Sequence, residues 1–229
     1  DAVTDNCGIC DSDVSNDCNA DCNGEFGGDA ELDECGVCNG DGIADGTCDC
    51  AGSITDCGGS CNNENVELWG ECYNIETTTH LYLYSNELTG EIPSEIGSLI
   101  NLISINLSSN DLIGELPSEI GNLINLEELR IDDNQLSGPL PIEIGNLTNL
   151  KNLWLINNNI SGNIPVQIGN LINLEYLVLQ YNELTGIIPV EICNQGDTTP
   201  NVLDNKLCPP YPECISQEDI NSQDTSNCP

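Results

Sequence analysis

Leucine and isoleucine recur at fixed intervals through the middle of the chain, over residues 75 to 192. Stretches such as Leu153-Trp154-Leu155 alternate core-type residues with others at a period of two, which is typical of a half-buried β-strand. Three further residue types return every 24 residues: Asn86, Asn110, Asn134, Asn158 and Asn182; Gly90, Gly114, Gly138, Gly162 and Gly186; Pro93, Pro117, Pro141, Pro165 and Pro189. Such a period predicts a solenoid, in which each coil buries its leucines against its neighbours.

The repeated unit contains L-x-x-L-x-L-x-x-N-x-L, the signature of leucine-rich repeats. Its second half, L-x-G-x-I-P-x-x-I-G-x-L, resembles the plant-type subclass found in plant receptor ectodomains and wall-enzyme inhibitors. A degenerate sixth unit, VLDNKLCPP, surrounds Asn205. We therefore expect an α/β-type solenoid with mostly β-structure: a short, curved leucine-rich-repeat solenoid of five full repeats plus a degenerate sixth.

The repeated asparagine, glycine and proline are interpreted as structural. We expect each asparagine to be buried at the turn after a strand, where its side chain bonds backbone groups of adjacent coils. Glycine at a tight bend and proline with its fixed φ shape the return segment of each coil. These positions therefore receive no binding role.

The residues that flank the core leucines point to the outer surface of the stacked strands. We expect them to line the concave side of the solenoid: His80, Tyr82 and Tyr84; Ser104, Asn106 and Ser108; Glu128, Arg130 and Asp132; Asn152, Trp154 and Ile156; Tyr176, Val178 and Gln180. The chain's only histidine, its only arginine, one of its two tryptophans and three of its six tyrosines fall in this set.

Aromatic side chains and arginine are enriched at binding hot spots, and Trp and Tyr also stack on sugar rings. We therefore predict a ligand-binding site made of His80, Tyr82, Tyr84, Asn106, Arg130, Trp154, Tyr176 and, at the edge, Tyr181. The alternative is that aromatic residues on exposed strands only stabilise the sheet through cross-strand packing.

Cysteine is concentrated at the two ends of the chain. Of the 15 cysteines, eleven lie between Cys7 and Cys72 and four between Cys193 and Cys228, and these last four can close internally. This density predicts disulfides and an extracellular or cell-surface location. We expect an acidic Cys/Asp/Gly-rich module over residues 1–62, an N-terminal cap with Trp69 over 63–79, the repeats over 80–192 and a cysteine-containing C-terminal cap over 193–229.

The N-terminal module has no amphipathic period, so disulfides or a metal must hold its loops. Two acidic loops supply candidate calcium ligands: Asn39, Asp41 and Asp45 in NGDGIAD, and Asp11, Asp13 and Asp17 in DSDVSND. The first loop resembles thrombospondin type 3 and dockerin-like calcium loops, and the module resembles Cys/Asp/Gly-rich repeats of large secreted bacterial surface proteins. Calcium is therefore the predicted cofactor. Zinc at the C-x-x-C pairs, and an acidic loop without metal, are the alternatives.

The charge balance limits the classes of partner that the protein can bind. Three Lys plus Arg stand against 39 Asp plus Glu, a formal net charge of -36, which argues against nucleic acid and anionic lipid as partners. The absence of an apolar run of about 20 residues argues against membrane insertion. The sequence shows no catalytic constellation around His80, so we expect no enzyme. Two functions compete: an interaction module that binds an extracellular protein or glycan on the concave face, and a self-assembling subunit of an extracellular filament or surface layer.

Overall fold

The computed structural model describes residues 64–228 and, before them, residues 3–4, 10–11, 23, 30–33, 37–38 and 56–59. The chain forms two compact units, Asp1–Asn63 and Glu64–Pro229. In the first unit, β1 (Val3–Thr4) pairs antiparallel with β2 (Cys10–Asp11), and Leu32 and Cys38 form an isolated antiparallel β-bridge. Cys38 and Cys57 each take part in a disulfide. The described stretches of this unit therefore agree with the predicted disulfide-rich, loop-dominated module.

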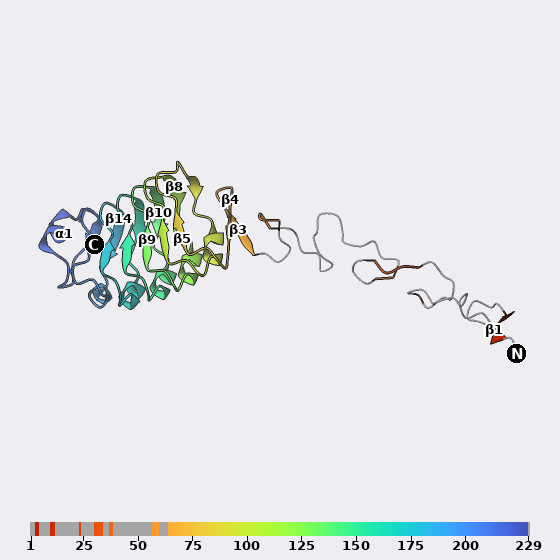
Figure 1. The fold of residues 1–229 in the computed structure, drawn as a ribbon. Helices are drawn as coiled ribbons and strands as arrows, with labels where there is room; N and C mark the ends of the chain where they lie inside the picture. Colours follow the sequence, from red (N-terminus) through yellow and green to blue (C-terminus); the bar gives the residue numbers. More distant parts are fainter. Residues whose placement is uncertain are drawn as a thin grey trace. The chain divides into compact units, whose positions relative to one another are not determined.

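The second unit is a solenoid of stacked coils (Figure 1). Within the described residues, its strands form a parallel five-stranded sheet and a parallel six-stranded sheet. The five-stranded sheet contains β5 (His80–Tyr82), β7 (Ser104–Asn106), β9 (Glu128–Arg130), β11 (Asn152–Trp154) and β13 (Tyr176–Val178). The six-stranded sheet contains β6 (Thr89–Glu91), β8 (Asp111–Gly114), β10 (Gln135–Pro139), β12 (Asn159–Gly162), β14 (Glu183–Ile187) and β15 (Lys206–Cys208). Each successive coil thus adds one strand to each sheet, as the repeat period predicts.

A short 3-10 helix follows the repeat proline in each coil, because the ring fixes φ at a value that suits the start of a helix. These helices are η1 (Ser94–Ser98), η2 (Ser118–Asn122), η3 (Ile142–Asn146), η4 (Val166–Asn170) and η5 (Val190–Cys193). Successive helices pack too closely for a side chain between them: a Cβ on Gly145 would lie 2.5 Å from the Cβ of Gln167. The glycine that follows the buried isoleucine in each of η1 to η4 therefore sets the spacing of the coils.

The apolar core runs the length of the solenoid. Leu153 and Leu155 are fully buried, which confirms the inward direction that the alternation predicts. Equivalent leucines and isoleucines of the neighbouring coils join the same core cluster. Because no coil can bury these side chains alone, the stacking of coils is what removes them from water.

The repeated asparagines connect adjacent coils. Asn158 accepts a hydrogen bond from the backbone N–H of Leu136 at 3.0 Å and donates to the carbonyl of Ile131 at 2.9 Å. Asn205 makes the same contacts, accepting from Leu184 N–H at 3.0 Å, which confirms the degenerate sixth repeat. The expectation of burial is wrong for Asn86, which is exposed because it belongs to the first coil and has no repeat before it.

Caps cover both ends of the core. At the N-terminal end, β3 (Asn65–Leu68) and β4 (Glu71–Asn74) form a hairpin. Trp69 at the hairpin turn packs against the core, as predicted for a cap residue. At the C-terminal end, α1 (Gln217–Ser222) supplies Asp219, whose carboxylate accepts from the N–H of Val202 at 2.8 Å.

The four C-terminal cysteines pair within the cap, Cys193 with Cys214 and Cys208 with Cys228, as the sequence allows. Cys72 in β4 is also disulfide-bonded. In the described part of the chain, no helix has the length and apolar character that crossing a bilayer requires.

Candidate functional site

The outward side of the five-stranded sheet carries the predicted site, and we call it the five-stranded face. Its strands pair in register, so that one row runs through Tyr82, Asn106, Arg130, Trp154 and Val178. A second row runs through His80, Ser104, Glu128, Asn152 and Tyr176. Neighbouring strands lie about 4.8 Å apart, so side chains in one row are in direct contact.

Arg130, Trp154 and Tyr176 form one connected cluster. The guanidinium carbon of Arg130 lies 4.2 Å from the centroid of the Trp154 ring, a cation–π contact. The ring of Tyr176 meets Trp154 edge-on, with 6.5 Å between centroids. Trp154 is half-buried and its indole N–H has no hydrogen-bond acceptor in the described structure. This cluster presents a rigid aromatic surface at the C-terminal end of the face.

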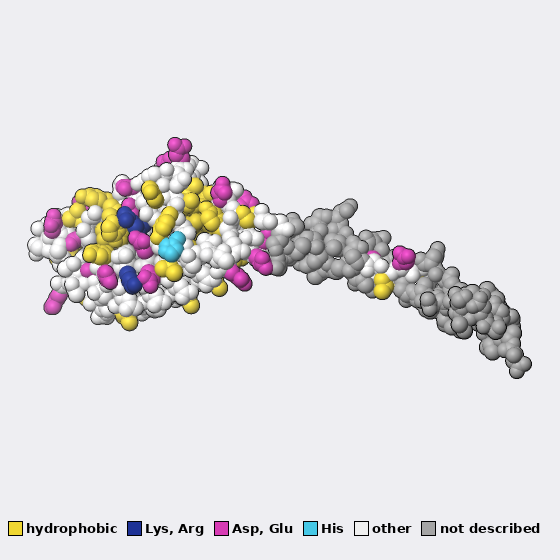
Figure 2. All heavy atoms as spheres, in the orientation of Figure 1, with side chains coloured by type: hydrophobic (Ala, Val, Ile, Leu, Met, Phe, Trp, Pro, Cys, Tyr) yellow, Lys and Arg dark blue, Asp and Glu magenta, His cyan; other side chains and the backbone are white. Residues whose placement is uncertain are grey.

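A second aromatic group lies at the N-terminal end of the face. His80 and Tyr82 meet edge-on with centroids 5.5 Å apart, and the Nδ1 of His80 lies 3.0 Å from the hydroxyl of Thr79. Tyr82 and Tyr84 are 55% and 58% exposed. In Figure 2, hydrophobic side chains accordingly lie on both sides of the Lys and Arg atoms on the face that carries the histidine.

Small and charged residues separate the two aromatic groups. Ser104, Ser108 and Asp132 are buried although they occupy outward strand positions. Ser104 donates to Glu128 at 2.7 Å, and Ser108 donates to Asn106 at 2.6 Å. Their short side chains are covered by these longer neighbours in the next coil or strand position.

Tyr181 adopts an unusual backbone conformation. The residue at the turn after each of the five strands of the face has a positive φ, as does Asp204 in the sixth coil, and the other four turns of the face hold Ser85, Ser109, Asp133 and Asn157. Tyr181 has a φ of 56° at the equivalent position. A bulky side chain is disfavoured in this left-handed region, where Asn and Asp are enriched. The tyrosine is nevertheless 47% exposed, so packing in the core does not explain its presence.

A groove of about 520 Å³ runs beside the face at the start of its strands, and we call it the asparagine groove. Its lining includes Glu76, Asn101, Ile103, Asn125, Glu127 and Asn149. The groove was not predicted from the sequence, although asparagine at positions 101, 125, 149 and 173 also keeps the period of 24 residues.

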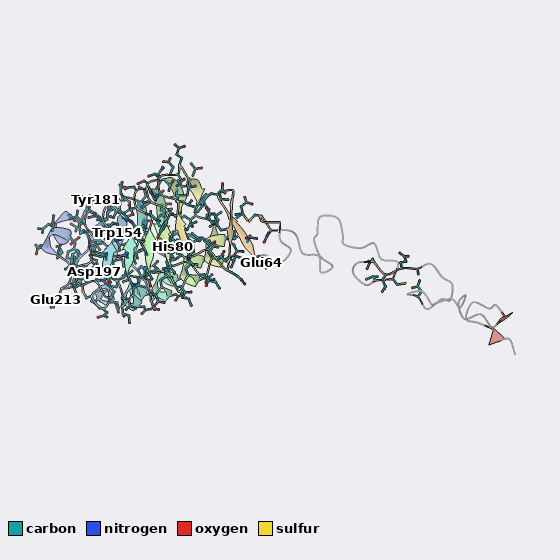
Figure 3. All side chains as sticks on the ribbon, viewed as in Figure 1. Glu64, His80, Trp154, Tyr181, Asp197 and Glu213 are labelled. Carbon is teal, nitrogen blue, oxygen red and sulfur yellow. A yellow bond between two sulfur atoms is a disulfide. The ribbon has the colours of Figure 1, made fainter. Side chains whose placement is uncertain are left out.

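In Figure 3, Tyr181 lies beyond one end of the strands and Asp197 beyond the other, with Trp154 between them.

Every Lys and Arg side chain of the protein faces a carboxylate. Arg130 pairs with Asp132 at 3.5 Å, Lys151 pairs with Glu127 at 2.7 Å, and Lys206 pairs with Glu183. The hydrogen bond from Lys151 to Glu127 raises the pKa of Lys151, and the bond to Glu183 raises the pKa of Lys206 in the same way. All three cations of the chain are therefore paired with a carboxylate of the same molecule.

The predicted calcium ligands cannot be placed in a site. Asp11 belongs to β2, and Asn39, Asp41, Asp45, Asp13 and Asp17 lie outside the described residues. Among the residues that the structure does describe, His, Cys, Asp and Glu form no group that could hold a metal ion. Calcium therefore stays a prediction from the sequence.

The coil geometry and the repeat spacing agree with a comparison against known families. Residues 60–193 match the family described as leucine-rich repeat region. The chain belongs to this leucine-rich repeat family. A comparison with curated proteins finds no match.

Solved structures of leucine-rich-repeat proteins from plants are similar to the solenoid. The ectodomain of the receptor kinase GASSHO1/SCHENGEN3 from Arabidopsis thaliana, in complex with CASPARIAN STRIP INTEGRITY FACTOR 2, is 36% identical with a TM-score of 0.58, over 59% of this chain and 16% of that one. The Arabidopsis receptor kinase HAESA, in complex with the peptide hormone IDA and a co-receptor, is 40% identical with a TM-score of 0.55, over 57% of this chain and 22% of that one.

A plant ice-binding protein is also similar, being 35% identical with a TM-score of 0.50, over 52% of this chain and 39% of that one. The chain thus spans less than a quarter of the length of either receptor structure. Because the same solenoid serves both hormone receptors and an ice-binding protein, the function has to be argued from the surface of this chain.

Proposed function

We propose that this protein is a non-enzymatic extracellular interaction module that binds a protein partner on its five-stranded face. The observation that carries the proposal is a pair of aromatic groups on one sheet, the exposed Tyr82 and Tyr84 at one end and the half-buried Trp154 with the exposed Tyr176 at the other. Aromatic anchors on a preorganised surface lose little conformational entropy on binding. Plant receptors of the same family bind peptide ligands, which supports a protein over a glycan as the partner. The disulfides of the C-terminal cap support an extracellular location.

The backbone conformation of Tyr181 gives a specific reason to assign a binding function to the five-stranded face. Its left-handed backbone costs roughly 1 kcal/mol relative to a residue that tolerates this conformation. Trp69 in the N-terminal cap has a similar φ of 49°, but it packs against the core, whereas no core packing accounts for the exposed Tyr181, and unexplained strain of this kind motivates a hypothesis of function. We therefore assign Tyr181 to the binding surface beside Trp154 and Tyr176.

The substitution Tyr181→Asn separates binding from folding. Asparagine suits the backbone at this position, as Asn157 does one coil earlier, so the variant is expected to unfold at a higher temperature than the natural protein. The same variant is expected to lose a partner retained from extracellular material of the source organism. The matched control is Val190→Ser, which changes an exposed side chain on η5 away from the five-stranded face.

The outcomes of this comparison are distinct. Retention of the partner by the natural protein and Val190→Ser, with loss in Tyr181→Asn, supports binding on the face. Equal retention by all three proteins contradicts it. An oligosaccharide in place of a protein among the retained molecules would keep the face as the site and change the class of ligand.

Self-assembly into an extracellular filament or layer is the second candidate function. It is favoured by apolar side chains exposed at one equivalent position of three consecutive coils, Ile142, Val166 and Val190. A repeated apolar strip of this kind is a suitable contact for a second copy. Sedimentation of the purified protein with and without calcium tests it: concentration-dependent polymers that Val166→Ser abolishes support assembly, and a monomer under both conditions contradicts it.

A further inference from the structure

The chemistry of the partner follows from the charges that the molecule leaves unmatched. The chain has three Lys plus Arg against 39 Asp plus Glu. All three cations are engaged with carboxylates, and two of them, Arg130 and Lys151, lie on or beside the five-stranded face. An anionic ligand would have to break one of these pairs to find a counter-charge. A cationic ligand meets carboxylates in excess and is drawn by the field of the whole molecule.

The asparagine groove is rich in hydrogen-bond acceptors because its asparagine side chains use their N–H groups to bond the preceding coil. The amide groups of Asn101, Asn125 and Asn149 donate to carbonyls of the preceding coil, at distances of 2.9, 3.0 and 2.8 Å. These bonds use the donor end of each amide, and no donor in the described part of the chain contacts the Oδ1 ends. Together with the carboxylates of Glu76 and Glu127, the groove therefore offers acceptor oxygens; its lining has no Lys or Arg, and the one cation paired with a lining carboxylate is Lys151 at its edge.

The neighbouring aromatic rings suit the same type of ligand. Arg130 over Trp154 at 4.2 Å shows that a guanidinium already stacks on an aromatic ring of this face. Tyr82, Tyr84, Tyr176 and Tyr181 present further rings, all about half-exposed. Lys and Arg side chains of a ligand are attracted to such faces, and more strongly where water is excluded.

We propose that the ligand of the five-stranded face is a basic peptide segment, with Lys or Arg side chains placed in the asparagine groove and against the exposed tyrosines. The inference rests on the proposed function and adds the chemistry of the partner. Glu127 sets the affinity for such a ligand, because its carboxylate lines the groove and is partly neutralised by its ion pair with Lys151.

The test uses a short synthetic peptide of alternating Arg and Ser, with the corresponding Glu and Ser peptide as its counterpart, titrated calorimetrically into the full chain. The informative variant is Lys151→Gln, which frees Glu127 beside the groove. The matched control is Lys206→Gln, which makes the same change in net charge and frees Glu183 in the other sheet. Lys151 is exposed and Lys206 is partly exposed, and each makes one surface ion pair, so neither change should disturb folding.

The expected result is that Lys151→Gln binds the Arg and Ser peptide about 1.5- to 5-fold more tightly, the range of one exposed ion pair. Lys206→Gln should bind like the natural protein, and added salt should weaken all three titrations. Equal tightening in both variants would overturn the inference, because it would assign binding to overall charge.

A third variant, Trp154→Ala, distinguishes this inference from the proposed function because it leaves net charge unchanged. Loss of the Arg and Ser peptide in Trp154→Ala, together with the tightening in Lys151→Gln, supports both. Preference for the Glu and Ser peptide, lost in Trp154→Ala, would overturn the basic ligand and leave the face as a binding site. Peptide binding that Trp154→Ala does not change would remove the support for the face itself.

Discussion

The buried asparagine of each coil allows the stacking of repeats to be tested with a matched pair of substitutions. Asn158→Ala removes the acceptor of the fully buried Leu136 N–H, a bond of 3.0 Å. It also removes the bond to the carbonyl of Ile131, which keeps a second donor from Asn134 at 3.2 Å. An unsatisfied buried N–H costs about 1–3 kcal/mol and the lost second bond about 1 kcal/mol, so the expected destabilisation is about 2–4 kcal/mol.

Asn86→Ala is the control for this prediction. Asn86 occupies the same repeat position but is exposed, and its side chain makes one bond, to the carbonyl of Tyr84 at 3.0 Å. Water can replace that bond, so the expected cost is below about 1 kcal/mol. Denaturant unfolding followed by tryptophan fluorescence measures both, because Trp69 and Trp154 lie in the solenoid unit. Equal losses in the two variants would refute the argument that buried amide bonds join the coils.

Four further predictions use other parts of the chain. Trp154→Phe should keep the ring stack and remove an unsatisfied buried N–H, so unfolding free energy should be unchanged or higher; a loss above about 1 kcal/mol in denaturant melts would contradict this. Gly145→Ala should cost about 1–3 kcal/mol in the same assay, because its Cβ would press on Gln167. Replacing Cys208 and Cys228 by serine removes a disulfide that spans 20 residues and should lower the free energy of unfolding by about 3 kcal/mol. Denaturant melts of the variant are compared with those of the natural protein in its oxidised and reduced forms. Calcium should raise the melting temperature of the N-terminal unit and chelator should lower it, by the equivalent of about 2–4 kcal/mol at saturation; identical melts would rule out a tight calcium site.

The solenoid was predictable because its repeated positions are many and each coil interacts only with its nearest neighbours. The 24-residue period of Asn158 and its equivalents predicted the stacking of strands, which the two parallel sheets confirm. The alternation around Leu153 predicted that its side chain points into the core, and its full burial confirms this. The exposure of Asn86 was not evident from the pattern, because it depends on the absence of a preceding coil. Repeat patterns describe interior units well and terminal units poorly.

The site was only partly predictable. Strand alternation placed Tyr82, Arg130 and Trp154 on one face, but it could not show that Arg130 stacks on Trp154 and pairs with Asp132. Those contacts depend on side-chain rotamers across neighbouring coils. The strain at Tyr181 also required coordinates, because a turn position is recognisable in the sequence while its φ is not.

Site-specific photo-crosslinking tests whether a protein partner lies on the five-stranded face. A photoreactive residue at Val178, in the row of Trp154, is compared with the same residue at Val190 on η5. Extracellular material of the source organism supplies the partners, and mass spectrometry identifies what is linked. We predict that a protein is crosslinked from position 178 and not from position 190. Crosslinks only from position 190, or only to further copies of the chain, would contradict it.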